Sequence, residues 1–356
     1  MNKPFSDLIV VELAAVLAGP SAGLFFAELG ANVIKIENPK TGGDVTRSWK
    51  LQSENKEDKT SAYYWSINSG KEILFLDLLL DNDLQQFYNL IKTADILISN
   101  YKLGDDIKLK VDYSSLKKLN PTLIYASING FGNNSPRTAY DLILQAESGF
   151  MFMNGEKNAS PLKMPVALID ILAGHQLKEA ILIALLNKYK TNQGSHITVS
   201  LFDTAIASLA NQATNWLIAH HLPIAQGSLH PNIAPYGEIF KTKDNHQITF
   251  AIGSDKQFKQ LCEILNIQVI PEYSNNQLRV ANRLALFNLL NEQIQKLDFE
   301  ILFNKCVKHD VPIGKIRNLK EVFELPEAQH LINTFNYQNY TVCNVKSVAF
   351  KFNEFM

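Results

Sequence analysis

The sequence predicts an α/β protein with a Rossmann-like large domain, built on a parallel sheet, and a smaller α/β domain. Residues 9–13 form a short apolar run, residues 21–29 can form a helix, and residues 33–36 form a second apolar run. This strand–helix–strand order is a βαβ unit, which pairs its strands in parallel and covers the sheet with helices. The length of 356 residues is enough for two domains of ordinary size.

Punctuating residues support the first unit, and the same alternation continues along the large domain. Pro20 suits the first position of a helix because its missing N–H would be unpaired there, and Gly30 is a typical C-terminal stop. Further strands are expected at 73–78, 96–99, 123–128 and 197–201, and helices at 84–94, 114–119, 141–153, 170–190 and 202–221.

A proline-rich connection separates the two expected domains. Residues 221–235 contain three prolines and one glycine. We therefore expect a large domain of residues 1–222, rejoined by residues 319–356, and a small α/β domain of residues 223–318. In the small domain, strands are expected at 236–240 and 247–252, helices at 255–265, 277–295 and 299–309, and an exit segment at 313–317.

Composition narrows the class of protein. Hydrophobic residues are 46% and charged residues 19% of a chain with net charge −1, which indicates a globular protein and no nucleic-acid partner. The sequence has no apolar run of about 18 residues, so we expect no membrane span. The three cysteines share no short spacing, so they predict neither a disulfide framework nor a metal site and favour the cytoplasm, with residues 1–37 retained.

Several common cofactor and catalytic signatures are absent. The turn at residues 14–20 has one of the three glycines that a dinucleotide site needs, so we expect no NAD. The sequence also lacks a P-loop, an HExxH motif and a GxSxG elbow. Lys strongly outnumbers Arg, so a phosphate-bearing ligand must be held mainly by Lys and backbone amides.

Asp170 lies where a strand-like run becomes a long helix. A carboxylate at that point can accept backbone N–H groups and face the positive end of the helix dipole, which would keep it ionised and fixed. From these residues alone, a plain helix N-cap is favoured over a catalytic group.

Short motifs in a characteristic order extend over nearly the whole chain. They include VLAGP at 16–20, LGANVIKIE at 29–37, GDVTR at 43–47, NSGK at 68–71, DILISNY at 95–101, DILAG at 170–174 and PNIAPY at 231–236. Together they make the chain resemble the class III coenzyme A-transferases, a family that includes formyl-CoA and carnitine-CoA transferases and 2-methylacyl-CoA racemases. The resemblance implies an interlocked homodimer in which each chain forms an open ring.

The resemblance implies a covalent transfer of coenzyme A from an acyl-CoA to a free carboxylic acid. Asp170 matches the family's nucleophile, whose carboxylate attacks the thioester. The implied path passes through a mixed anhydride and a β-aspartyl-CoA thioester before the acceptor acid receives CoA. Asp141 matches an acidic position close to that nucleophile, with a plain N-cap as the alternative.

The resemblance also implies where CoA binds. Val16 and Leu17 would abut the thioester end, and Leu17 replaces the Gln of the formyl-CoA enzymes, which argues against formyl-CoA. Loops 68–72 and 100–104 would hold the adenine, and nearby cations the phosphates. The expected binding residues are Val16, Leu17, Asn68, Lys71, Asn100, Tyr101, Lys102, Lys108, Arg137 and Tyr140. For each of these lysines, a solvated surface position is the alternative.

Two alternatives to a CoA-transferase stay open. A racemase of the same fold is disfavoured because Tyr140 stands where the racemases carry a proton-shuttling His. A catalytically silent CoA-binding dimer is the second alternative, because the chain closes soon after residues 348–352, before a Gly-rich stretch that family members usually have. The acyl donor, the acceptor and the pathway are not specified, since one methylene changes binding by only about 1–3 kcal/mol.

Overall fold

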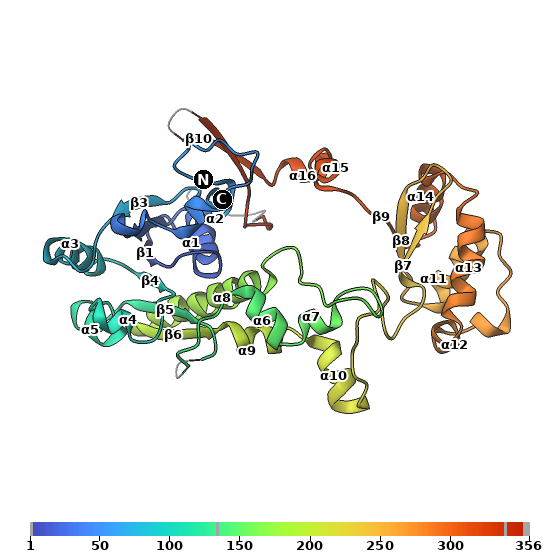
Figure 1. Cartoon of the computed structure of the whole chain (residues 1–356), viewed down its shortest axis with the longest axis horizontal. Helices are drawn as coiled ribbons and strands as arrows, with labels where there is room; N and C mark the ends of the chain where they lie inside the picture. Colours follow the sequence, from blue (N-terminus) through green and yellow to red (C-terminus); the bar gives the residue numbers. More distant parts are fainter. Residues whose placement is uncertain (1–2, 133–134, 338–339, 352–356) are drawn as a thin grey trace. The chain divides into compact units, whose positions relative to one another are not determined.

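The computed structural model describes residues 3–132, 135–337 and 340–351. Its chain forms two compact units (Figure 1). The large unit comprises Met1–Phe152, Leu162–Pro223 and His330–Met356, and the small unit comprises Met153–Pro161 and Ile224–Gln329. The chain leaves the large unit next to the expected boundary at 222, and it rejoins that unit later than the expected residue 319.

The large unit contains a six-stranded sheet in which every neighbouring pair of strands is parallel. Its strands are β1 (Ile9–Leu13), β2 (Asn32–Glu37), β3 (Glu72–Phe75), β4 (Ile96–Ser99), β5 (Ile124–Asn129) and β6 (Ser195–Ser200). The order across the sheet is β3-β2-β1-β4-β5-β6, which is the doubly wound Rossmann order. The predicted α/β class and its parallel sheet are therefore confirmed.

Helices cover both faces of this sheet, so its central strands β1 and β4 carry consecutive apolar residues instead of alternating apolar and polar ones. Val10 and Val11 on β1 are both fully buried although they point to opposite faces. One face packs against α1 (Ala18–Glu28), α8 (Leu168–Thr191) and α9 (Leu201–Ala207), and the other against α3 (Asp81–Ile91) and α5 (Tyr113–Leu119) (Figure 1).

The close packing of α1 against α8 brings the first turn of α1 against Gly174 in the second turn of α8. A Cβ added at Gly174 would lie 2.1 Å from Ser21 Oγ and 3.0 Å from the Ala18 carbonyl oxygen. Glycine at this position therefore permits the approach. The helix α1 begins at Ala18, so Pro20 occupies the third position of the helix, whereas the sequence predicts it at the first.

Three helices that the sequence predicts as continuous are each divided in two. The segment 141–153 forms α6 (Asp141–Glu147) and α7 (Phe150–Met153), interrupted at Gly149, whose φ is +88°. The segment 202–221 forms α9 and α10 (Ala210–Ala219), and Ala210 has a φ of +48°. In the small unit, the segment 277–295 is divided at Asn282, whose side-chain amide and backbone N–H both donate to the carbonyl of Leu278.

Several elements of the large unit were not predicted. They are η1 (Pro39–Thr41), η2 (Val45–Ser48), α2 (Ala62–Asn68), α4 (Asp105–Lys108), β10 (Ile332–Tyr337) and β11 (Tyr340–Val345). The antiparallel hairpin β10–β11 packs on α2 through Trp65, whose ring centroid lies 5.4 Å from that of Phe335 and 4.6 Å from that of Tyr337. These contacts attach the β10–β11 hairpin to α2.

The small unit is an α/β unit with an antiparallel sheet. Its strands are β7 (Tyr236–Lys241), β8 (Gln247–Ala251) and β9 (Ile313–Lys315), and its helical segments are α11 (Asp255–Ile264), η3 (Pro271–Tyr273), α12 (Asn276–Ala281), α13 (Arg283–Ile294), α14 (Phe299–Lys308), α15 (Leu319–Phe323) and α16 (Pro326–Gln329). Buried Phe240, Phe250 and Leu290 form part of its own core. Among the described helices, none has the length and apolar character needed to cross a bilayer.

Candidate active site

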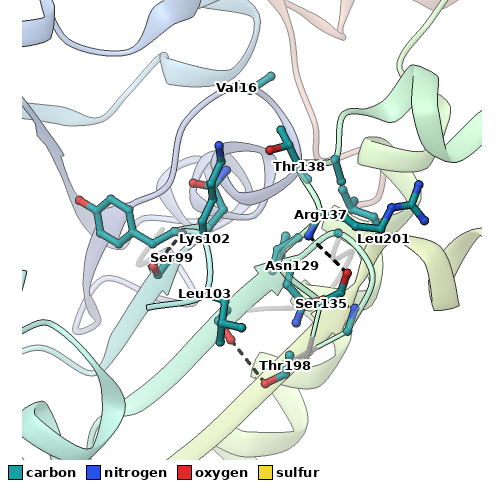
Figure 2. Close-up of a pocket in the computed structure, with 18 of the residues that line it drawn as sticks. Val16, Ser99, Lys102, Leu103, Asn129, Ser135, Arg137, Thr138, Thr198 and Leu201 are labelled. Atoms are coloured by element: carbon teal, nitrogen blue, oxygen red, sulfur yellow. Dashed lines mark hydrogen bonds between the residues drawn. The ribbon is translucent and has the colours of Figure 1, made fainter. Parts of the chain in front are cut away.

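A cavity of about 450 Å³ lies at the carboxyl ends of β1, β4 and β5 (Figure 2). The strand order reverses between β1 and β4, and ligands of open α/β sheets bind in the crevice at such a switch point. The cavity is lined by the loops that follow these strands, by Asp170 at the start of α8 and by Thr138–Tyr140. The fold therefore places a binding cavity beside the candidate nucleophile.

Asp170 is a buried carboxylic acid in the first turn of α8, with 7% of its surface exposed. Within the described ranges, no residue donates a hydrogen bond to its carboxylate. Burial, and then the nearby Asp141 carboxylate, raise the pKa of Asp170 to about 7. The expectation that backbone N–H groups keep this carboxylate ionised is therefore wrong: Asp170 is half protonated near neutral pH.

Asp141 caps α8 in place of Asp170. Its Oδ1 accepts the backbone N–H groups of Ile169 and Asp170, at 2.7 and 3.3 Å. Its Oδ2 accepts the side-chain amide of Gln145 at 2.6 Å. The structure thus brings the two acids together. The alternative for Asp141 was a plain N-cap of its own helix, α6, but Asp141 caps α8, which begins far along the chain.

The turn between β1 and α1 is held in a strained conformation at the edge of the cavity. Val16 has a φ of +72°, which costs a β-branched residue about 1–3 kcal/mol. The Val16 N–H donates to Asp44, at 3.3 Å from Oδ2. Ala15 exchanges two hydrogen bonds with the Asn100 side chain, at 3.0 and 2.8 Å, and the Ala14 carbonyl accepts from Lys35 at 2.6 Å. Three side chains therefore fix three consecutive residues.

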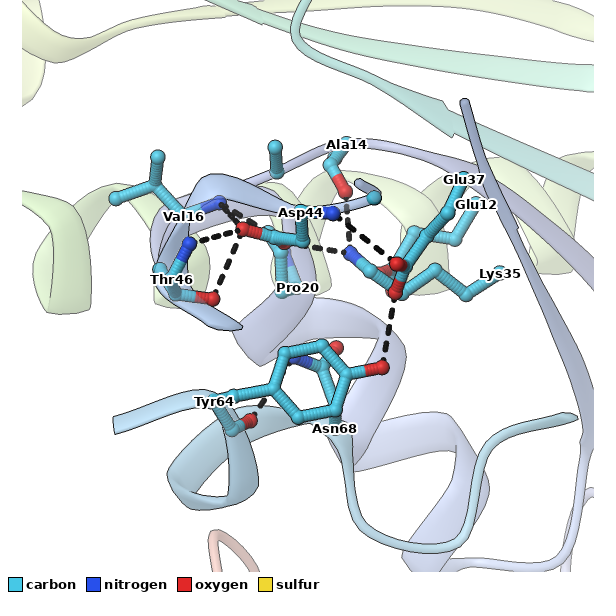
Figure 3. Close-up of polar contacts among 12 residues, drawn as sticks. Glu12, Ala14, Val16, Pro20, Lys35, Glu37, Asp44, Thr46, Tyr64 and Asn68 are labelled. Atoms are coloured by element: carbon cyan, nitrogen blue, oxygen red, sulfur yellow. Dashed lines mark hydrogen bonds and ion pairs between the residues drawn. The ribbon is translucent and has the colours of Figure 1, made fainter. Parts of the chain in front are cut away.

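Asp44 and Lys35 belong to a largely buried network of three acids and three cations, called the ion network below, of which Figure 3 labels Glu12, Lys35, Glu37 and Asp44. Its members are Glu12, Lys35, Glu37, Asp44, Arg47 and Lys71. Lys35 pairs with Glu12 at 2.9 Å and with Asp44 at 3.0 Å. Glu37 accepts the Asp44 backbone N–H at 3.0 Å and pairs with Arg47 at 2.6 Å. Equal numbers of opposite charges allow this group to be buried.

Two of the expected CoA-binding residues lie outside the cavity: Lys71 is a member of the ion network, and Asn68 contacts Lys71. The Lys71 side chain is fully buried, pairs with Glu12 at 2.9 Å and donates to the Pro20 carbonyl at 2.8 Å. Burial lowers the pKa of Lys71 to about 8, although the Glu12 carboxylate opposes the change. Asn68 is also buried and accepts from Lys71 at 3.1 Å. Neither side chain reaches the surface in this conformation, so the structure gives no support to the prediction that Asn68 and Lys71 contact CoA.

The other expected binding residues differ in whether they line the cavity. Lys108 is not among the cavity-lining residues: it is exposed on α4 and pairs with Asp105 at 3.0 Å. Arg137 lines the cavity, where it pairs with Glu147 and lies 3.9 Å from the ring centroid of Phe131. The remaining expected residues that line the cavity are Val16, Leu17, Asn100, Tyr101, Lys102 and Tyr140, of which Val16 and Lys102 are labelled in Figure 2.

A row of hydroxyl groups on the cavity floor was missed. Ser99, Ser127 and Thr198 are in register across β4, β5 and β6, and all three line the cavity (Figure 2). Two residues earlier on β5 and β6, Tyr125 and His196 are also paired, and both line the cavity. The available signal was the polar residue that ends the otherwise apolar strand β4, whereas β6 is polar along most of its length and gave no such signal. Among the described residues, no three His, Cys, Asp or Glu side chains are grouped to hold a metal ion.

Comparisons with known proteins agree with the fold. The sequence model of CoA-transferase family III matches residues 5–355. The chain is 41% identical to a succinate–glutarate CoA-transferase of Agrobacterium fabrum, over 92% of this chain and 84% of that protein. It is 32% identical to a succinyl-CoA:glutarate CoA-transferase of Homo sapiens, over 99% and 81%. A CAIB/BAIF family protein from Brucella suis, 36% identical, has a crystal structure that matches with a TM-score of 0.84, over 99% of this chain and 94% of that chain.

The chain therefore belongs to CoA-transferase family III, as its motifs indicated, and is a transferase whose substrate is an acyl-CoA. Both of these relatives are named as CoA-transferases, so the racemase alternative is not favoured.

The burial of Lys71 predicts a structural role. Lys71→Ala removes one cation from the ion network and should lower the free energy of unfolding by about 3–5 kcal/mol. The control Lys102→Ala removes an exposed cation and should change it by less than about 0.5 kcal/mol. Urea unfolding of the two variants measures both values, and equal stability of the two would contradict the assignment of Lys71 to the network.

The raised pKa of Asp170 predicts that this acid destabilises the fold above neutral pH. Its pKa in the folded protein, about 7, exceeds the ordinary value of 3.8, so wild type loses stability as pH rises between these values. Asp170→Asn should therefore be more stable than wild type by up to about 4 kcal/mol at pH 8, and the difference should shrink toward pH 4.

Urea unfolding between pH 4 and pH 8 measures this difference. Asp203→Asn is the matched control, because Asp203 lies in the first turn of α9 but is exposed. A difference between Asp170→Asn and wild type that stays constant across this range would show that Asp170 carries no such penalty.

Proposed function

We propose that the chain transfers coenzyme A from an acyl-CoA to a free carboxylic acid through a covalent intermediate on Asp170. The observation that supports this most is a buried carboxylate without a hydrogen-bond donor among the described residues, facing a cavity at the switch point of the sheet. A carboxylate without donors is a stronger nucleophile than one engaged in hydrogen bonds, and a pKa near 7 leaves half of it ionised at neutral pH.

The proposed reaction consists of acyl exchanges that balance at every step. The Asp170 carboxylate attacks the thioester carbonyl, and the C–S bond breaks to give a mixed anhydride and the CoA thiolate. The thiolate then attacks the Asp170 carbonyl and releases the donor acid, which leaves a β-aspartyl-CoA thioester. The acceptor carboxylate repeats the two exchanges in reverse, so that Asp170 is regenerated as a carboxylate.

We propose dicarboxylic acids as the substrate class, with succinyl-CoA as donor and glutarate as acceptor. The support is the naming of the two relatives, at 41% and 32% identity over most of the chain. Lys102 and Arg137 line the cavity and supply cations for the CoA phosphates or the distal carboxylate of such an acid. Exposed Lys102 is the simpler partner, because Arg137 is already paired with Glu147.

The chemistry is tested by trapping the intermediate. Wild type mixed with succinyl-CoA and glutarate should form glutaryl-CoA, and hydroxylamine added to enzyme and succinyl-CoA should leave a hydroxamate on Asp170. Asp170→Asn should lose transfer by at least about a thousandfold, because an amide cannot form the anhydride. Mass spectrometry of the CoA esters and of the Asp170 peptide reads both results, with Asp203→Asn as the control that keeps transfer.

The pH dependence adds a second criterion. Attack needs ionised Asp170, so the trapping rate should rise about tenfold per pH unit below pH 7 and level off above it. Near wild-type transfer by Asp170→Asn would exclude the covalent route. If wild type neither transfers CoA nor forms the adduct with any donor, the catalytically silent CoA-binding dimer becomes the better description.

We further propose that the chain is a homodimer, interlocked as the family resemblance implies. Apolar side chains on α8 and α10 support a partner surface: Ile183, Leu186, Leu217 and Ile218 are 65–78% exposed in the single chain. Sedimentation velocity should give a dimer for wild type and a shift toward monomer for Leu217→Asp with Ile218→Asp. The control Leu79→Asp changes an exposed leucine outside these helices and should stay dimeric. A monomeric wild type at micromolar concentration would contradict the dimer.

A further inference from the structure

The strained turn at Val16 needs an explanation, because a β-branched residue adopts a φ of +72° only where its surroundings hold it. The turn lies at the reacting end of the cavity: Val16, Leu17 and Ala18 line the cavity together with Asp170. The question is which side chain holds the Val16 peptide, and what the site gains from it.

Asp44 is the side chain that holds this peptide. Its two carboxylate oxygens lie 3.4 and 3.3 Å from the Val16 nitrogen (Figure 3). The carboxylate is itself fixed, since it pairs with Lys35 at 3.0 Å and accepts the backbone N–H and the hydroxyl of Thr46, at 3.0 and 2.9 Å. Glu37 accepts the Asp44 backbone N–H at 3.0 Å. Asp44 therefore cannot follow the turn if the turn relaxes.

We propose that Asp44 is a positioning residue for acyl transfer: its carboxylate holds Val16 in the left-handed conformation that aims the start of α1 at the reacting carbonyl beside Asp170. This inference rests on the proposed function, because it assigns the start of α1 a part in that reaction. Asp44 is 5% exposed and is not among the residues lining that cavity, so it acts through Val16 and not by touching the substrate.

The start of α1 has donors to offer. Its N-cap residue, Leu17, makes no side-chain capping bond, and the first N–H groups of a helix have no partner within the helix. Attack of Asp170 on a thioester turns the carbonyl oxygen into an oxyanion, which such N–H groups stabilise only if they are already in place. A displaced turn should therefore lower kcat more than it raises KM for the acyl-CoA.

A purely structural role for Asp44 predicts something different, and Val16→Gly separates the two. Glycine adopts a φ of +72° without strain, so a glycine turn needs Asp44 much less. If Asp44 acts through the strained peptide, Asp44→Asn should be harmful with Val16 present and mild with Val16→Gly. If Asp44 serves only the stability of the ion network, the harm should be the same in both backgrounds.

The experiment is a double-mutant cycle with kcat and KM for succinyl-CoA measured in all four proteins. Asp44→Asn should lower kcat at least tenfold in the Val16 background and less than threefold in the Val16→Gly background. The matched control is Asp95→Asn, whose carboxylate accepts the backbone N–H of Ile9 at the opposite end of β1 and pairs with Lys188. It should change kcat less than twofold. Equal losses in both backgrounds, or an equal loss in the control, would overturn the proposal.

Thr46→Val provides a variant that leaves no buried charge unpaired, should Asp44→Asn fail to fold. It removes one of the hydrogen bonds that fix Asp44, and its smaller loss of kcat should also diminish with Val16→Gly. No loss in either background would count against Asp44 as a positioning residue.

Hydrogen exchange of the peptide covering residues 14–19 separates this proposal from the proposed function. Asp44→Asn should speed exchange of that peptide, and Val16→Gly should reduce the difference between the Asp44→Asn and Asp44 proteins. If wild type shows no transfer at all, the proposed function fails, while the exchange data still decide whether Asp44 holds the turn. Unchanged exchange in Asp44→Asn would overturn the proposal whatever the activity.

Discussion

The site depends on the contacts that the buried amine of Lys35 makes. This amine joins the end of β2 to Glu12 on β1, to Asp44 and to the Ala14 carbonyl, all within 3.0 Å. Burial alone would lower the pKa of Lys35, but the Glu12 and Asp44 carboxylates outweigh it and raise the pKa, so the amine stays charged. Without that charge, two carboxylates would be buried beside each other, and the ends of β1 and β2 could not close around them. The position of the β1–α1 turn follows from this closure.

The acids at the start of α8 illustrate how stability and reactivity conflict. The helix needs an acceptor for its first N–H groups, and Asp141 supplies one at the favourable end of the helix dipole. The same carboxylate, together with burial, disfavours the charge on Asp170. The fold thus gains a cap by placing a negative charge against the group that ionises in the reaction proposed above. A neutral cap such as Asn would leave Asp170 more acidic and, for the same reason, a weaker nucleophile.

Much of the fold could be predicted from the sequence because strand runs and breakers are local signals. The strands Ile9–Leu13 and Ile96–Ser99 have the predicted bounds, whereas the break at Gly149 in the expected helix 141–153 was not predicted. For the candidate site, the family resemblance and not the strand pattern pointed to Asn100 and Asp170, and both line the cavity. The role of Lys71 was not predictable, because spacing along the chain does not reveal that Glu12 and Asn68 enclose its amine. The capping of α8 by Asp141 depends likewise on tertiary packing.

The missing glycine fingerprint and the strained Val16 are both properties of the turn between β1 and α1. In a dinucleotide-binding fold, glycines let the first βα turn bend tightly and let strand and helix approach. Here only Gly19 remains, and a Cβ there would lie 2.4 Å from the Cβ of Ala14, so it serves the approach of strand and helix. The bend itself falls to Val16, which lacks glycine's freedom and is held by Asp44. A glycine turn would be mobile when empty, whereas a valine turn fixed by a buried carboxylate is already placed when a substrate arrives. An enzyme that must stabilise a short-lived oxyanion benefits from such a fixed turn more than a protein that only binds a diphosphate.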